Sequence, residues 1–171
     1  MGITRIVVLL YLLSSLCQAA TLTSSSHSSN PNRTDLEAAI EDMRAKSFYG
    51  FAILLQMLNA TTQLALRDIT FFIPRDAQLS NISIAVGRLE AFVFSHFIAM
   101  PLQFSDLIRF PTGSMVPSGV HNRMIRVHNH GRAHFLVNNA EVTVPNVCAT
   151  HTVKCHGVNR VIDYGHANLA S

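Results

Sequence analysis

The stretch that decides the fold is residues 133–163, AHFLVNNAEVTVPNVCATHTVKCHGVNRVID, in which three short apolar runs are separated by residues that favour turns. Val142 and Val144 alternate with polar residues, which predicts a strand with one buried face. The Asn-Asn pair at 138–139 predicts a turn before this strand, and Pro145 predicts that the strand ends there or lies at a sheet edge.

The two cysteines of this stretch, Cys148 and Cys155, are spaced for pairing. Apolar residues flank His151 and Thr152 on both sides. If these two residues form the turn of a hairpin, Cys148 lies directly opposite Cys155. Opposed residues of an antiparallel pair lie about 4.5–5.5 Å apart at Cα, which is within the reach of a disulfide. We therefore expect a C-terminal hairpin closed by a Cys148–Cys155 disulfide.

Residues 1–19 have the pattern of a secretory signal peptide. Arg5 supplies a positive charge, residues 6–13 are apolar, and small residues stand at positions 17 and 19. The apolar run is shorter than the roughly 20 residues of a membrane span. We therefore expect cleavage after residue 19 or 20, and no stable membrane span in the mature protein. Cleavage also removes the third cysteine, Cys17, and leaves one pair in an oxidising compartment.

The remaining chain of about 150 residues fits one domain with its own core. We assign residues 20–33 to a linker rich in Ser and Thr, residues 34–165 to the domain and residues 166–171 to a C-terminal tail. The formal charge of +3, or +2 without Arg5, and the absence of a basic run argue against nucleic acid as a partner.

Three N-x-[ST] sequons begin at Asn32, Asn59 and Asn81. A single match of this kind is common by chance, but three behind a signal peptide predict a glycoprotein. Each glycosylated asparagine would then lie at the surface.

The order of the expected elements places helices before strands. Thr34 and Glu37 form the pattern of a capping box, which predicts a helix that ends near Lys46. Further elements are a buried helix over residues 51–58 that ends near Asn59, a strand over residues 69–73 stopped by Pro74, a short helix over residues 89–94, and a hairpin of residues 124–127 and 134–137. This order indicates an α+β fold rather than a repeated βαβ unit.

With these elements in order, the chain resembles a single domain of the fasciclin family. The segments that carry the resemblance are residues 70–77 (TFFIPRDA), 94–98 (FSHFI), 107–117 (LIRFPTGSMVP), 137–147 (VNNAEVTVPNV) and 156–162 (HGVNRVI). The resemblance implies a wedge of β-strands packed with N-terminal helices. It also implies a role in adhesion and in the organisation of the extracellular matrix or cell wall, and it is strongest to plant fasciclin-like cell-wall proteins.

The sequence departs from the family pattern at several motif positions. Arg75 replaces a Thr or Ser, Ser95 replaces a Tyr, and Asn146 and Asn159 each replace an Asp. The Ser95 substitution falls in the Tyr-His motif associated with adhesion.

Three residues of these motifs are interaction candidates: Asp76, Ser95 and His96. Asp76 has the position of an Asx-turn or of a cap on the helical turn that follows, with a place on a binding edge as the other interpretation. His96 is expected as a hydrogen-bonded core residue or as a contact for a partner.

Histidine is the residue that supports a second interpretation. All nine histidines would follow the signal peptide, and several would gain charge in a mildly acidic extracellular space. His128 and His130 would share a strand face and His134 would lie across the turn, an arrangement that could surround Zn²⁺ or Cu²⁺. No carboxylate or cysteine close in sequence completes such a site, so we expect no metal and no cofactor.

Enzyme motifs are absent from the sequence. It contains no Gly-x-Ser-x-Gly elbow, no glycine-rich phosphate loop and no evident pair of placed carboxylates. The hypothesis is therefore a secreted, non-catalytic binding module, located in the apoplast or cell wall if the source is a plant. Its expected partners are cell-wall or matrix polysaccharides or glycoproteins. The other hypothesis is a histidine-rich extracellular binding protein that responds to pH or metal.

Overall fold

The computed structural model describes residues 34–62 and 66–165. The expected signal peptide with Cys17, the linker with Asn32, and the tail at 166–171 lie outside the described residues. The helices are α2 (Asp35–Ala45), α3 (Tyr49–Thr62), α4 (Asp76–Leu79), the 3₁₀ turn η1 (Val86–Arg88), α5 (Leu89–Phe94) and α6 (Phe104–Leu107). The strands are β1 (Ile69–Pro74), β2 (Phe97–Ile98), β3 (Met115–Pro117), β4 (Met124–Asn129), β5 (Phe135–Val137), β6 (Ala140–Ala149) and β7 (Val153–Val158).

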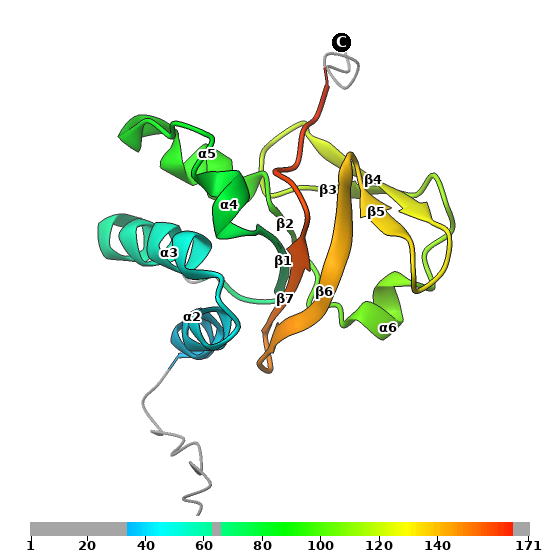
Figure 1. The fold of residues 1–171 in the computed structure, drawn as a ribbon, viewed down its shortest axis with the longest axis horizontal. Coiled ribbons are helices and arrows are strands. Elements are labelled where there is room, and N and C mark those ends of the chain that lie inside the picture. Colours follow the sequence, from blue (N-terminus) through cyan, green and yellow to red (C-terminus); the bar gives the residue numbers. More distant parts are fainter. Residues whose placement is uncertain (1–33, 63–65, 166–171) are drawn as a thin grey trace, which may run out of the picture. The chain divides into compact units, whose positions relative to one another are not determined.

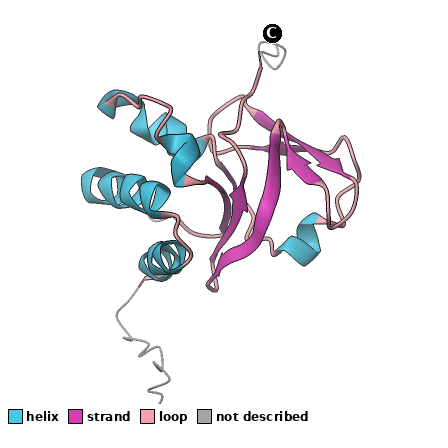
Figure 2. Cartoon of the chain, viewed as in Figure 1, coloured by secondary structure: helices cyan, strands magenta, loops and turns pink. Residues whose placement is uncertain are grey.

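The strands form one mixed sheet in the order β2-β1-β7-β6-β5-β4-β3. β1 and β7 run parallel, whereas the other neighbouring strands run antiparallel. Helices α2 to α5 gather on one side of β1 and β7, and α6 lies beyond β6 (Figure 1; Figure 2). The expected α+β fold, with N-terminal helices packed on β-strands, is confirmed.

Two apolar layers hold this arrangement together, one on each side of β1 and β7. Neighbouring side chains of a strand point to opposite faces, so Phe71 lies in the layer beneath the helices and Phe72 lies in the layer enclosed by the remaining strands. α2 contributes Leu36, Ile40 and Met43 to the first layer. The apolar face of this helix therefore packs on the sheet.

The C-terminal hairpin has the expected register. Cys148 pairs with Cys155 across β6 and β7, their Cα atoms lie 4.8 Å apart, and a disulfide joins them. Of the two alternatives for Pro145, the end of the strand is wrong, because β6 continues through Pro145 to Ala149. The register with β7 shifts on this part of β6, so the proline lies in a bulge. β5 pairs with β6 at Ala140 and Glu141, so the proline interrupts no pairing on that side.

The helix ends follow the sequence in one case and depart from it in another. The capping box of α2 is confirmed: Glu37 N donates to Thr34 Oγ1, and Thr34 N donates to Glu37 Oε2. The predicted end near Asn59 is wrong, because α3 continues to Thr62. The hydroxyls of Thr61 and Thr62 donate to the Leu58 carbonyl within the last turn, which leaves Asn59 inside the helix. In the described ranges, no helix has both the length and the apolar character needed to cross a membrane.

Candidate functional site

Asp76 is a helix cap, but for a helix that precedes it in the chain. It begins α4, and its Oδ1 accepts from Gly50 N at 2.9 Å while its Oδ2 accepts from Tyr49 N at 3.2 Å. Both donors are first-turn amides of α3, where a carboxylate also interacts favourably with the helix dipole. The prediction that Asp76 caps the turn that follows it is therefore wrong. Its carboxylate instead caps α3 and so links α3 to α4.

His96 lies in the interior and is fully engaged. Its Nδ1 lies 2.8 Å from the Phe92 carbonyl oxygen, and its Nε2 accepts from Ile162 N at 3.2 Å. An acceptor nitrogen carries no proton, so the ring is neutral with its proton on Nδ1. Burial lowers the pKa of His96 to about 4, against the opposing effect of the Phe92 carbonyl. The ring thus joins α5 to the segment after β7.

His156 is a second buried histidine that the sequence reasoning did not single out. Its Nδ1 accepts from Asn146 N at 3.0 Å, and its Nε2 donates to the Leu102 carbonyl at 3.0 Å. Burial lowers the pKa of His156 to about 4, with the Leu102 carbonyl acting in the opposite direction. These two histidines therefore stay neutral in mild acid and are not among the several that were expected to gain charge there. The only sequence signal for His156 was its place in the HGVNRVI segment.

Ser95 lines an open groove of about 430 Å³, which we call the Ser95 groove. Its walls come from the chain between α4 and α5, from α5, from the turn before β4 and from the segment after β7. The lining residues are Ile82, Ser83, Ile84, Ala85, Arg88, Ala91, Phe92, Ser95, Val120, Arg123, Val161, Ile162, Asp163 and Tyr164. The volume lies in the range of sites that bind small organic ligands.

Tyr164 forms one wall of the Ser95 groove, and its contacts there include a hydrogen bond and a cation–π contact. Its hydroxyl donates to the Ser95 carbonyl, and the Arg123 guanidinium lies 5.0 Å from the centroid of its ring. Burial raises the pKa of Tyr164 to about 12, so the phenol is protonated at any physiological pH. The groove therefore has a rigid aromatic wall beneath an exposed cation.

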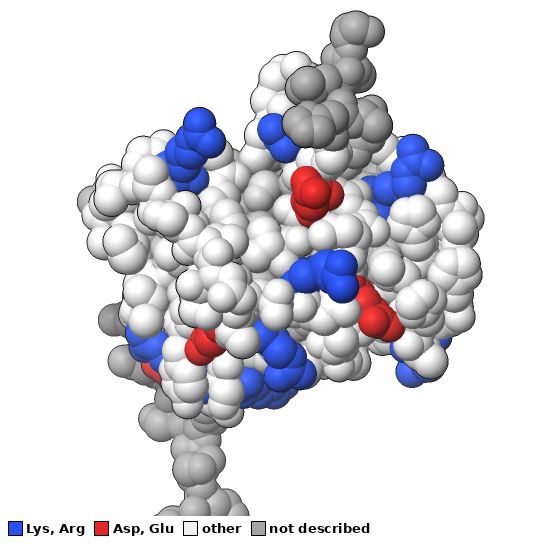
Figure 3. All heavy atoms as spheres, turned by 45° about the horizontal axis from the view of Figure 1, so that its top comes forward, with Lys and Arg blue, Asp and Glu red and all other residues white. Residues whose placement is uncertain are grey.

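Two arginines give the Ser95 groove its charge. Arg88 and Arg123 are exposed, and neither guanidinium donates a hydrogen bond or forms an ion pair with any described residue. The acidic member of the lining, Asp163, accepts from Gly165 N at 3.0 Å. Charged side chains are scattered over the face shown in Figure 3, with broad uncharged areas between them, so no large basic surface appears on that face.

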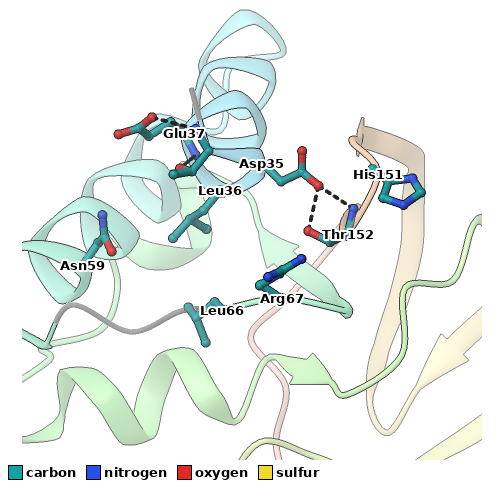
Figure 4. Close-up of a pocket in the computed structure, with 9 residues that line it drawn as sticks. Asp35, Leu36, Glu37, Asn59, Leu66, Arg67, His151 and Thr152 are labelled. Atoms are coloured by element: carbon teal, nitrogen blue, oxygen red, sulfur yellow. Dashed lines mark hydrogen bonds between the residues drawn. The ribbon is translucent and has the colours of Figure 1, made fainter. Parts of the chain in front are cut away.

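A second hollow, which we call the α2 cleft, lies where the tip of the β6–β7 hairpin meets α2 (Figure 4). It has a volume of about 470 Å³ and is lined by Thr34, Asp35, Leu36, Glu37, Asn59, Leu66, Arg67, His151 and Thr152. Asp35 Oδ2 accepts from both the Thr152 hydroxyl at 2.7 Å and Thr152 N at 2.6 Å. These two hydrogen bonds lower the pKa of Asp35 and hold the hairpin tip on the helix.

The three candidate metal-binding histidines do not come together as expected. β4 ends at Asn129, so His128 lies in the strand and His130 lies beyond it, and the two do not share a strand face. The rings of His130 and His134 stack with centroids 5.5 Å apart, and His134 Nδ1 lies 2.9 Å from Glu141 Oε1. Within the described ranges, no three His, Cys, Asp or Glu side chains group as a metal site. Glu141 reaches His134 through the pairing of β5 with β6, which the local sequence pattern did not indicate.

The family model of the fasciclin domain matches residues 46–164. The chain belongs to the fasciclin domain family. Fasciclin domains are generally adhesion modules of extracellular or cell-surface proteins. α2 precedes the matched range, yet its buried side chains belong to the core.

Two comparisons place the chain beside known proteins. A FAS1 domain-containing protein of Selaginella moellendorffii is 25% identical over 134 residues, which are 77% of this chain and 50% of that protein. A solved FAS1 domain pair from the insect cell adhesion molecule fasciclin I is 15% identical with a TM-score of 0.49, over 77% of this chain and 46% of that one. The chain thus spans about half the length of each.

Proposed function

We propose that this chain is a secreted, N-glycosylated fasciclin domain that binds cell-wall or matrix polysaccharides or glycoproteins without catalysing a reaction. The Ser95 groove is the binding surface. The observation that carries the proposal is that this groove combines the guanidinium groups of Arg88 and Arg123, neither of which hydrogen-bonds or ion-pairs with a described residue, with the apolar and hydroxyl-bearing groups of its walls.

The chemistry of the groove favours acidic polysaccharides. A guanidinium presents a planar set of donors that matches a carboxylate or sulfate with two parallel hydrogen bonds. Arg123 is held over Tyr164, so less freedom is lost when it binds an anion. Sugar rings with uronate or sulfate groups supply both the anion and the apolar faces that the walls of the groove can cover.

Binding of the secreted protein to immobilised polymers tests the proposal. The panel contains a uronate polymer, a sulfated glycan and a neutral β-glucan, and the supernatant is assayed for released sugar. We expect binding to the acidic polymers that weakens with added salt, and no sugar release. The double variant Arg88→Gln with Arg123→Gln should bind at least about tenfold more weakly, because charge-assisted hydrogen bonds contribute roughly 1.5–3 kcal/mol each.

Arg132→Gln is the matched control, since Arg132 is exposed and lies outside the Ser95 groove. Equal binding by the double variant, the control and the unchanged protein would remove the groove from the proposal. Binding to no polymer would leave proteins as the partners to search for, and release of sugar would replace the binding module with a hydrolase.

The contact of His130, His134 and Glu141 favours a second candidate function, an extracellular binding protein that responds to pH or metal. Protonation of His134 beside Glu141 creates an ion pair, whereas protonation of both stacked rings sets two positive charges against each other. Polymer binding at pH 5 and pH 7, by the unchanged protein and by His134→Gln, tests this function. Binding that is equal at both pH values, together with no heat on Zn²⁺ titration, would exclude it.

A further inference from the structure

We propose that the α2 cleft holds the chain's own N-glycan: the sugar attached to Asn59 packs in this cleft and bridges α3, α2 and the hairpin tip. The inference rests on the proposed glycoprotein nature of the chain. It adds a saccharide-binding site that is filled from within the molecule, separate from the Ser95 groove.

The position of Asn59 directs its glycan into the cleft. Asn59 is half-buried, lies in the last turns of α3 and lines the α2 cleft. Its side chain stands on α3 on the side that faces α2 (Figure 4). The side-chain amide of Asn59 makes no hydrogen bond with any residue that the structure describes. Attachment of a sugar at its Nδ2 therefore breaks no such bond. The first sugar ring, bonded to this nitrogen, must therefore lie in or over the cleft.

The lining of the cleft suits a sugar. The polar groups around it include the Arg67 guanidinium, which has no partner in the described part of the chain, and the carboxylates of Glu37 and Asp35. Sugar hydroxyls can donate to carboxylates and accept from guanidinium groups. Leu36 and Leu66 add apolar surface for the ring and for an N-acetyl methyl group. The volume of about 470 Å³ is in the range of small-ligand sites.

Asn81 provides an internal contrast. It is exposed, its Nδ2 donates to the Ala77 carbonyl at 2.9 Å, and it does not line the α2 cleft. A glycan at Asn81 therefore extends from the surface, whereas a glycan at Asn59 lies against the protein. The two sites should differ in how easily an enzyme can reach the linkage.

The first test measures occupancy and enzymatic release at each site by mass spectrometry of the secreted, folded protein. We expect both asparagines to be occupied, with release from Asn81 at least tenfold faster than from Asn59. Unfolding the protein first should make the two rates equal. In the folded Arg67→Ala variant, release from Asn59 should become faster, while release from Asn81 should not change.

A second measurement separates the glycan from the asparagine itself. Thr61→Ala removes the sequon but keeps Asn59, and Ser83→Ala does the same for Asn81. Thr61→Ala should lower Tm in the glycosylated protein, and this difference should shrink after the enzyme has removed all glycans. Ser83→Ala should change Tm little in either form.

The outcomes distinguish the inference from the proposal on which it rests. An unoccupied Asn59, or equal release rates at Asn59 and Asn81 in the folded protein, would overturn the inference alone. Absence of glycan at all three sequons, Asn32 included, would overturn both. Slow release from Asn59, together with a lower Tm of the glycosylated Thr61→Ala variant, would establish that the glycan lies in the α2 cleft.

Discussion

Asp76 Oδ1 accepts a hydrogen bond from Gly50 N at 2.9 Å, so the first residue of α4 caps the start of α3. Position 50, a glycine, lies where the two helices approach each other closely. A Cβ there would lie 2.9 Å from Leu79 Cδ1 and 3.2 Å from Asp76 Oδ1. The cap and the close approach of the two helices therefore depend on each other.

Replacing the Asp76 carboxylate should destabilise the domain. In Asp76→Ala, the Tyr49 and Gly50 amides lose their acceptor, and we expect a loss of about 1–2 kcal/mol in the free energy of unfolding. Asp76→Asn keeps one acceptor oxygen and should lose less. Urea denaturation measures both, with the exposed Glu90→Ala as control. Equal stability of Asp76→Ala and Glu90→Ala would contradict the cap.

The two buried histidines should make the domain less stable in acid. The pKa values of His96 and His156 in the folded protein are about 4, below the ordinary value near 6.5. The unfolded chain therefore takes up protons first, so their contribution to stability is complete above pH 6.5 and is lost as the pH falls from 6.5 to 4. Between pH 7 and pH 5, the loss is about 2 kcal/mol for each histidine.

Denaturation at several pH values, with two histidine variants, measures this dependence. His156→Gln should show a shallower decline between pH 7 and pH 5, whatever its stability at pH 7. His128→Gln, which changes a histidine outside the core, should retain the decline of the unchanged protein. An unchanged slope in His156→Gln would show that this ring does not contribute.

The disulfide should stabilise a hairpin that is already well paired. Cys148 and Cys155 are separated by 7 positions. Closing so short a loop stabilises by about 2 kcal/mol in the chain-entropy model, which corresponds to several degrees in Tm. Reduction, or the double variant Cys148→Ser with Cys155→Ser, should lower Tm by this amount. Free thiols in the native secreted protein would disprove the pairing.

Gly157 should tolerate no side chain. It pairs with Ile73 of β1, and a Cβ there would lie 2.4 Å from Phe48 Cζ and 3.0 Å from Val144 Cβ. Gly157→Ala should therefore destabilise by about 1–3 kcal/mol, the usual range for overpacking. Gly87→Ala is the control, because no atom lies within 4 Å of a Cβ at that position. Similar stability of the two variants would show that Phe48 moves aside freely.

Features set by neighbouring residues could be predicted from the sequence. The capping box of Thr34 and Glu37 and the pairing of Cys148 with Cys155 each depend on residues within one turn or one hairpin. Features that join distant segments could not. Local periodicity does not say that Asp76 caps α3, or that the ring of His156 donates to the carbonyl of Leu102, 54 positions away.

The α2 cleft and the Ser95 groove are also formed by distant segments, so they could not be predicted from the sequence. The cleft requires the start of α2, the end of α3 and the hairpin tip to meet, although Asp35 and Thr152 are 117 positions apart. The bulge at Pro145 was missed for a related reason, since proline breaks regular pairing but a bulged strand can continue past it. A proline in the sequence indicates that regular strand pairing is interrupted, but it does not indicate whether the strand continues beyond it.

The place of β7 between β1 and β6 has a consequence for how the chain comes to be folded. β1 has its parallel partner only when residues 153–158 have been synthesised, because Ile69 pairs with Val153. The core between the helices and β1 includes Val153 and Cys155 of β7, so it is complete only when this last strand is in place. Sheets built from such distant partners fold slowly. Until β7 has paired with β1, Asn59 and Asn81 belong to a chain whose sheet is incomplete. A sugar destined for a half-buried position can then be attached before the cleft around it exists.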